Sequence, residues 1–94
     1  MPETKQIKIK AKDEDLKGAF ANIMRIFHTK EEFILDFFLV SPPEEGILTS
    51  RVVLTPGHIK RMGRALQENI SKYEEQFGKI EEVGPPAGEI GFKA

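Results

Sequence analysis

The chain has 94 residues, 39% of them apolar and 31% charged, which is enough for one small domain with one core. It has no cysteine, which excludes disulfides, thiolate nucleophiles and cysteine-ligated metal sites and indicates a reducing compartment. A net charge of −1 gives little support to binding through many phosphate contacts. No apolar run approaches the ~20 residues of a membrane span, and residues 1–10 lack the apolar core of a signal peptide. We therefore expect a cytoplasmic protein that has no membrane partner.

Four segments have the patterns of β-strands. Residues 6–12 alternate isoleucine or alanine with lysine, which is typical of a strand with one face in water. Residues 19–28, 33–40 and 47–54 carry apolar side chains on both faces, and turn-forming residues separate them. The sequence thus predicts an α+β fold built on an antiparallel meander of about four strands.

A long amphipathic helix follows the strands. Thr55 suits the N-cap, Pro56 suits the first helical position, and Gly78 suits the left-handed residue past the end. This predicts about six turns, ~33 Å at 1.5 Å per residue. Six apolar residues follow the spacing of one helical face, and we expect this stripe to pack on one face of the sheet: Ile59, Met62, Leu66, Ile70, Tyr73 and Phe77.

Gly63 lies on the same stripe, where its missing side chain would allow close approach to the sheet. The end of the chain is rich in glycine and proline. We expect residues 1–83 to form a single domain and residues 84–94 to form a flexible tail.

The short turns predict the strand register. If the turn after His28 leaves that residue opposite Phe33, then Arg25 faces Asp36. If the next loop leaves Val40 opposite Ile47, then Asp36 also faces Arg51. Two separate turns therefore place one carboxylate between two arginines.

The same register divides the side chains between two faces. We expect the first face, which includes Phe33, Leu35, Phe37 and Leu48, to lie under the helix. The second face carries the ion network, and it is too apolar to remain in water. We expect it to form the interface of a dimer or of a pair of dimers, with these residues in the contact: Arg25, Ile34, Asp36, Phe38, Ile47, Arg51 and Val53.

Basic residues gather at the predicted start of the helix, where the helix dipole disfavours them. Together with free backbone amides they suit a phosphate or another anion, and they define the candidate nucleic-acid or anion site: Arg51, His58, Lys60, Arg61 and Arg64. The alternative is a solvated helix face, in which Glu68 pairs with Arg64 or Lys72. The segment "TPGH" lacks the several glycines and the placed lysine of a phosphate-binding loop.

No group of residues suggests catalysis. His28 and His58 are far apart and have no partners at metal-ligand spacing. The serines lack the histidine and acid of a hydrolase triad. We therefore expect no enzymatic activity, no metal and no cofactor.

Four motifs occur in order between Ala19 and Ile80: "FAN", "EEFILDF", "SRVVLTPGHIKRM" and "LQENISKYEEQFG". In these motifs the chain resembles a family of small bacterial and archaeal proteins that is catalogued as a domain of unknown function. It departs from the family pattern at Phe20, where tyrosine is expected. The resemblance implies three strands followed by a helix, and it assigns no activity and no site residues.

The leading functional hypothesis is a small homo-oligomer that serves in protein interaction or assembly. The alternative is a nucleic-acid or anion-binding protein that uses the basic start of the helix. The two differ in salt dependence, because binding to phosphates weakens as salt rises and an apolar contact does not.

Overall fold

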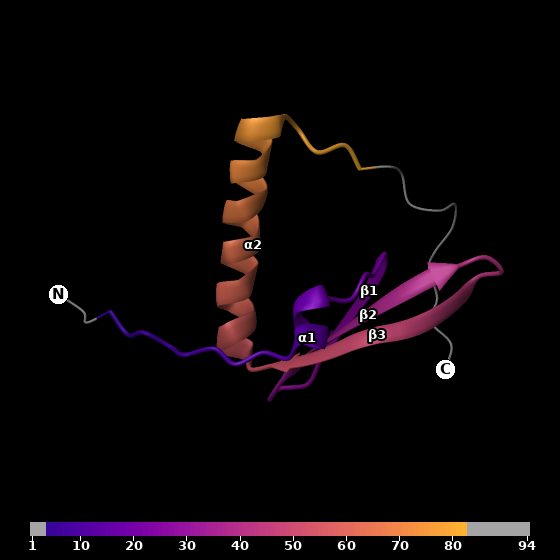
Figure 1. Ribbon diagram of the computed structural model, residues 1–94, viewed down its shortest axis with the longest axis horizontal. Helices are drawn as coiled ribbons and strands as arrows, with labels where there is room; N and C mark the ends of the chain where they lie inside the picture. The colour runs from indigo at the N-terminus through magenta and orange to yellow at the C-terminus, as the bar shows by residue number, and fades with distance from the viewer. Residues whose placement is uncertain (1–3, 83–94) are drawn as a thin grey trace. The chain divides into compact units, whose positions relative to one another are not determined.

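The computed structural model describes residues 4–82, and its architecture is α+β (Figure 1). The chain divides into two compact units, one up to Pro56 and one from Gly57 onward. The first holds a short helix and a three-stranded antiparallel sheet, and the second holds a long helix. The elements are α1 (Asp13–Lys17), β1 (Ile23–His28), β2 (Phe33–Ser41), β3 (Glu45–Leu54) and α2 (Pro56–Phe77).

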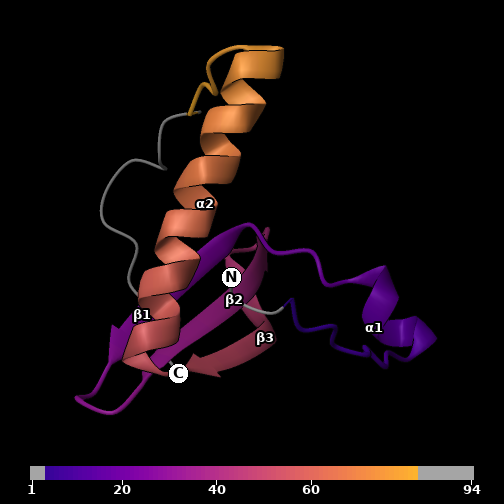
Figure 2. The ribbon, with the colours of Figure 1, turned by 90° about the vertical axis from the view of Figure 1, so that its left-hand side faces the viewer.

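The sheet is a meander in the order β1-β2-β3, with β2 in the centre (Figure 2). The turn between β1 and β2 is held by Thr29, whose hydroxyl accepts hydrogen bonds from the backbone N–H groups of Glu31 and Glu32 at 3.1 and 3.3 Å. His28 lies opposite Phe33, and their rings stack with centroids 5.1 Å apart. The predicted register of this hairpin is confirmed.

The second hairpin turns more tightly than predicted. Ser41 already pairs with Glu45, so Val40 lies opposite Gly46 and not opposite Ile47. The ladder then shifts by one residue, because Phe38 pairs with Leu48 whereas Phe37 pairs with Ser50.

Thr49 is the extra residue of this β-bulge, and its hydroxyl donates a hydrogen bond to the carbonyl oxygen of Phe37 at 3.1 Å. Between the tighter turn and the bulge, two predicted positions are reversed. Leu48 shares a face with Phe38, and Ile47 shares the opposite face with Leu39.

Asn22 extends the pairing of β2 beyond the end of β1. Its side-chain amide donates to the carbonyl oxygen of Val40 and accepts from the N–H of Val40, both at 2.9 Å. Its own backbone N–H donates to the carbonyl oxygen of Phe38 at 3.0 Å. The side chain therefore satisfies two backbone groups that β1 does not reach.

The fourth predicted strand, over residues 6–12, is not formed. Residues 4–12 have no regular secondary structure, and both Ile7 and Ile9 are exposed. The acidic turn that follows is helical instead, and the N–H of Lys12 donates to the Asp15 carboxylate at 3.2 Å. Alternation specifies a strand only where a neighbouring strand supplies hydrogen bonds, and within residues 4–82 no strand pairs with the segment.

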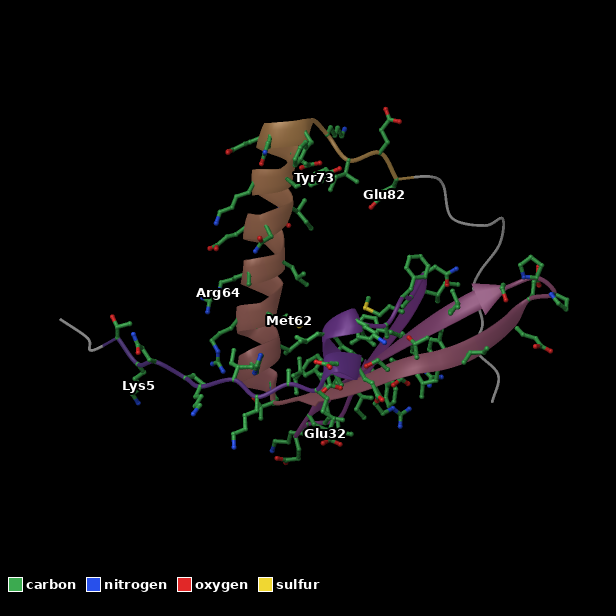
Figure 3. All side chains as sticks on the ribbon, in the orientation of Figure 1. Lys5, Glu32, Met62, Arg64, Tyr73 and Glu82 are labelled. Carbon is green, nitrogen blue, oxygen red and sulfur yellow. The ribbon has the colours of Figure 1, made fainter. Side chains whose placement is uncertain are left out.

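Helix α2 has the predicted bounds. It begins at Pro56, and Gly78 follows its last residue at φ +95°. The N–H of Gly78 donates to the Glu74 carbonyl oxygen, and the N–H of Ile80 donates to the Glu74 carboxylate, both at 2.9 Å. Figure 3 shows Met62 and Tyr73 on the side of the helix opposite Arg64.

The predicted packing of α2 on the sheet stays a prediction, as does the single domain over residues 1–83. The predicted tail, residues 84–94, lies outside the described residues.

Burial is concentrated at the centre of β2. Leu35, with 2% of its surface exposed, is the one fully buried apolar residue of the described chain, and its neighbour Asp36 is 0% exposed. Most large apolar side chains of the outer strands and of α2 are exposed. The described chain therefore leaves much of its apolar surface in contact with water.

Replacing Leu35 with alanine tests this centre. We expect the free energy of unfolding to fall by about 2 to 5 kcal/mol, because a buried leucine loses its packing contacts and leaves a cavity. Leu16→Ala, at an exposed position in α1, is the control and should change stability by less than about 0.5 kcal/mol. Urea denaturation at one protein concentration measures both. An equal loss in the two variants would show that Leu35 does not lie in a core.

Candidate functional site

The candidate site is a row of three charged residues across the sheet. Asp36 lies in the central strand, with Arg25 directly opposite in β1 and Arg51 directly opposite in β3. Directly opposed residues of an antiparallel sheet share a face, so the three side chains meet on one surface. The register that the sequence predicted for this row is confirmed.

Both oxygens of the Asp36 carboxylate are bound. Arg51 donates from Nε to Oδ1 at 2.6 Å and from Nη2 to Oδ2 at 2.8 Å. Arg25 donates from Nη2 to Oδ2 at 2.7 Å. These short, charge-assisted bonds include a two-point fork from Arg51, which fixes direction as well as distance.

Aromatic rings hold the two arginines in place. The guanidinium carbon of Arg25 lies 5.4 Å from the ring centroid of Phe27 and 5.3 Å from that of Phe38. The guanidinium carbon of Arg51 lies 5.9 Å from the ring centroid of Phe27. The side chains of Arg25 and Arg51 are 37% and 49% exposed, so the cations cover the carboxylate while keeping one side in water.

The network keeps its charges over the physiological pH range. Hydrogen bonds from Arg51 and then from Arg25 hold the pKa of Asp36 well below its usual range, against the opposing effect of burial. The hydrogen bond to Asp36 raises the pKa of Arg51 in turn. With two guanidinium groups and one carboxylate, the network carries one net positive charge.

Apolar residues surround this network. We call the surface the ion-network face, and the register assigns to it Ile23, Arg25, Phe27, Ile34, Asp36, Phe38, Val40, Leu48, Arg51 and Val53. Phe27, Leu48 and Val53 are exposed, whereas Ile34 and Phe38 are half-buried. The surface is therefore a rigid charged centre with an apolar border.

The candidate anion residues fall in two places. Arg51 belongs to the sheet and is engaged with Asp36. His58, Lys60, Arg61 and Arg64 all lie in the first half of α2. Nη1 of Arg61 comes within 3.7 Å of the position that a Cβ on Gly57 would occupy, so this guanidinium lies over the first turn of the helix. Anion binding by these residues stays a prediction.

The described residues contain no group of three or more His, Cys, Asp and Glu side chains that could hold a metal ion. Within residues 4–82, no helix has both the length and the apolar character that a membrane span requires.

A family model described as "Protein of unknown function (DUF3467)" matches residues 1–82, which include the sheet and α2. The chain belongs to this family. The resemblance inferred from the four motifs is confirmed, and two of these motifs carry Asp36 and Arg51 of the DUF3467 chain. No curated protein and no solved structure matches it. Membership of DUF3467 brings no activity with it, so the function must be argued from the surface itself.

Sequence reasoning missed two residues that position this site in the DUF3467 chain. Thr49 forms the bulge beside Arg51, and the only signal was a polar pair, Thr49 and Ser50, inside an apolar strand. Asn22 caps the pairing of β2, and its signal was a lone amide directly before β1. Neither pattern specifies its structure unless the partner strand is already known.

The low pKa of Asp36 predicts a pH-dependent stability. Because this pKa is lower in the folded chain than in the unfolded one, the network stabilises the fold fully above about pH 4 and loses its effect as pH falls toward the folded-state pKa. We expect Asp36→Asn to be less stable than wild type at neutral pH, with a difference that narrows below about pH 4. Urea denaturation over a pH series measures this difference.

Asp13→Asn, at an exposed position in α1, controls for general acid effects. A wild-type advantage over Asp36→Asn that stays constant down to low pH would show that Asp36 is not held ionised by the arginines.

Proposed function

We propose that this protein is a non-enzymatic, self-associating module for protein interaction or assembly, and that copies meet through the ion-network face. The observation that carries the proposal is this face: a fixed charged centre, Asp36 with Arg25 and Arg51, inside an apolar border that is partly exposed, at Phe27, Leu48 and Val53. Exposed apolar surface of this kind marks interaction sites on soluble proteins.

The architecture of the first unit supports self-association. A β-sheet has two faces, and the described part of this unit contains only the one sheet and the single-turn helix α1. Apolar residues occur on both faces, for example Met24 on one and Val53 on the other, and both are exposed. A single helix such as α2 can cover at most one face, so the other needs a second chain. Sheets packed face to face lie about 10 Å apart, which a second copy of the ion-network face can satisfy.

The chemistry of the network supports a structural role. Asp36 is the carboxylate that would be the candidate general base if the site were catalytic. Both of its oxygens accept hydrogen bonds, however, and its pKa is held low. Such a group is a poor general base, because a base must give up its partners to take a proton near neutral pH. It is well suited to orient two arginines rigidly at a contact.

Replacing Phe38 with lysine tests the contact surface. A lysine here adds a charge beside Arg25 within the apolar part of the ion-network face, so we expect the particle to become smaller and the dissociation constant to rise about tenfold or more. Sedimentation equilibrium measures the change, and circular dichroism confirms that α2 persists. Ile47→Lys adds the same charge to an exposed site on the opposite face and should leave the oligomer intact.

Salt dependence separates this proposal from nucleic-acid binding. An apolar contact should respond weakly to salt, whereas an association with RNA or DNA through Lys60, Arg61 and Arg64 should weaken steeply as salt rises. Titration with a labelled single-stranded RNA at low and high salt gives the comparison. Tight, salt-sensitive RNA binding by a monomeric protein would overturn the proposal.

A further inference from the structure

Helix α2 carries an apolar surface with a regular spacing, and this surface shares five residues with the stripe that was expected to pack on the sheet. Residues at alternating steps of four and three run along one side, and they form what we call the α2 seam: Ile59, Gly63, Leu66, Ile70, Tyr73 and Phe77. This is the seven-residue repeat by which two helices pack against each other along their length. The last four residues of the seam are exposed, from 41% at Ile70 to 66% at Phe77.

The charges of α2 indicate which way a partner helix runs. The first turn contains no acidic residue and the last turn no basic one, which is the reverse of what the helix dipole favours. Lys60, Arg61 and Arg64 lie in the first half, and Glu74 and Glu75 lie in the second. An antiparallel copy of α2 places each basic half beside an acidic half, and it also aligns the two helix dipoles favourably. A parallel copy would place like charges together.

The sizes of the seam residues agree with the same arrangement. Consider an antiparallel pair whose two-fold axis lies midway between Leu66 and Ile70. Leu66 of each chain then packs against Ile70 of the partner subunit. Gly63 then faces Tyr73 of the partner subunit, so the largest side chain of the seam meets the one position without a side chain. Apart from the backbone of the helix and the two neighbours of Gly63 in the chain, no atom of α2 lies within 4 Å of the place that a Cβ at Gly63 would take. The space is open for a partner residue.

The area of the sheet also calls for a second contact. With strands of 6, 9 and 10 residues, the sheet has an outline of roughly 400 Å², at about 3.3 Å per residue and about 4.8 Å between strands. A stable protein interface typically buries about 800 Å² on each partner. The ion-network face alone falls short of this area.

We propose that α2 pairs with α2 of a second copy as an antiparallel two-helix coiled coil through the α2 seam. This inference rests on the proposed self-association and names a second surface that serves it. Near the two-fold axis, Gln67 lies beside Gln67 of the partner subunit, and Lys60 lies toward the partner's Glu74. Residues on the far side of the helix, such as Glu68, point away from the pair.

Single cysteines test the arrangement, because the natural chain has none. We expect Gln67→Cys to give covalent dimers with a short bis-maleimide cross-linker. Glu68→Cys places the thiol one residue further along, on the far side of the helix, and the yield of cross-linked dimer should be at least tenfold lower. In a parallel pair, position 67 of the two chains would lie on opposite sides of the seam. Equal cross-linking at the two positions, or none at either, would overturn the helix pairing.

The same samples separate this inference from the proposed function. A wild-type protein that sediments as a monomer contradicts both. An oligomer that does not cross-link at position 67 contradicts only the helix pairing, and in that case the seam is covered by its own sheet or by another protein. A Phe38→Lys oligomer that is unchanged and still cross-links at position 67 contradicts only the contact through the ion-network face.

A size exchange gives a second test that does not depend on cross-linking. Gly63→Leu should strengthen the isolated helix, because leucine has a higher helix propensity than glycine. It should nevertheless weaken association by about tenfold or more, because the new side chain meets Tyr73 of the partner subunit. Adding Tyr73→Ala to Gly63→Leu should restore association. If Gly63→Leu associates as tightly as wild type, the proposed packing is wrong.

Discussion

The sheet depends on the burial of one charge, the carboxylate of Asp36. A fully buried carboxylate is tolerated only if its hydrogen bonds are satisfied, and here all of the charged donors come from the two neighbouring strands. A slip of one residue in either hairpin would move Arg25 or Arg51 to the other face and leave the carboxylate short of partners. The ion network therefore selects one register for both hairpins at once.

The bulge at Thr49 belongs to the same constraint. The tight turn that pairs Ser41 with Glu45 would, in an uninterrupted ladder, bring Ser50 opposite Asp36. One additional residue in β3 moves the ladder on, so that Arg51 takes that place. The sequence predicted the right pair through two errors that cancelled, a hairpin register that was off by one residue and a one-residue bulge that was not foreseen. Turn lengths are set by the residues of the turn, but a bulge depends on what the opposite strand requires.

Other elements could be predicted where their causes lie in neighbouring residues, and could not be predicted where their causes lie in distant ones. Helix α2 was predicted correctly because Pro56 and Gly78 act on the residues next to them. The strand predicted at residues 6–12 was wrong because alternation describes only one partner of a pair. The side chain of Asn22 makes hydrogen bonds to the backbone of Val40, eighteen residues away, in place of a partner strand. No residue close to Asn22 in the sequence indicates this contact. The ion pairs could be predicted because the registers of two short turns both place an arginine opposite Asp36. The aromatic contacts of the arginines and the burial of Asp36 could be seen only in the folded sheet.

Two different contacts on one small chain raise the question of how assembly stops. Each proposed contact is isologous, because the same surface meets itself across a two-fold axis. If the two axes cross at right angles, the assembly closes as a pair of dimers; if the axes do not meet, the same contacts extend into a filament. The surplus positive charge of each ion network bears on this choice, because every added sheet contact brings two such charges together. The charge pattern of α2 has the opposite character, since antiparallel pairing places the basic half of each helix beside the acidic half of its partner. In the proposed assembly the charges thus favour the helix pair and oppose the sheet contact, so the strength of the sheet contact sets the size of the particle.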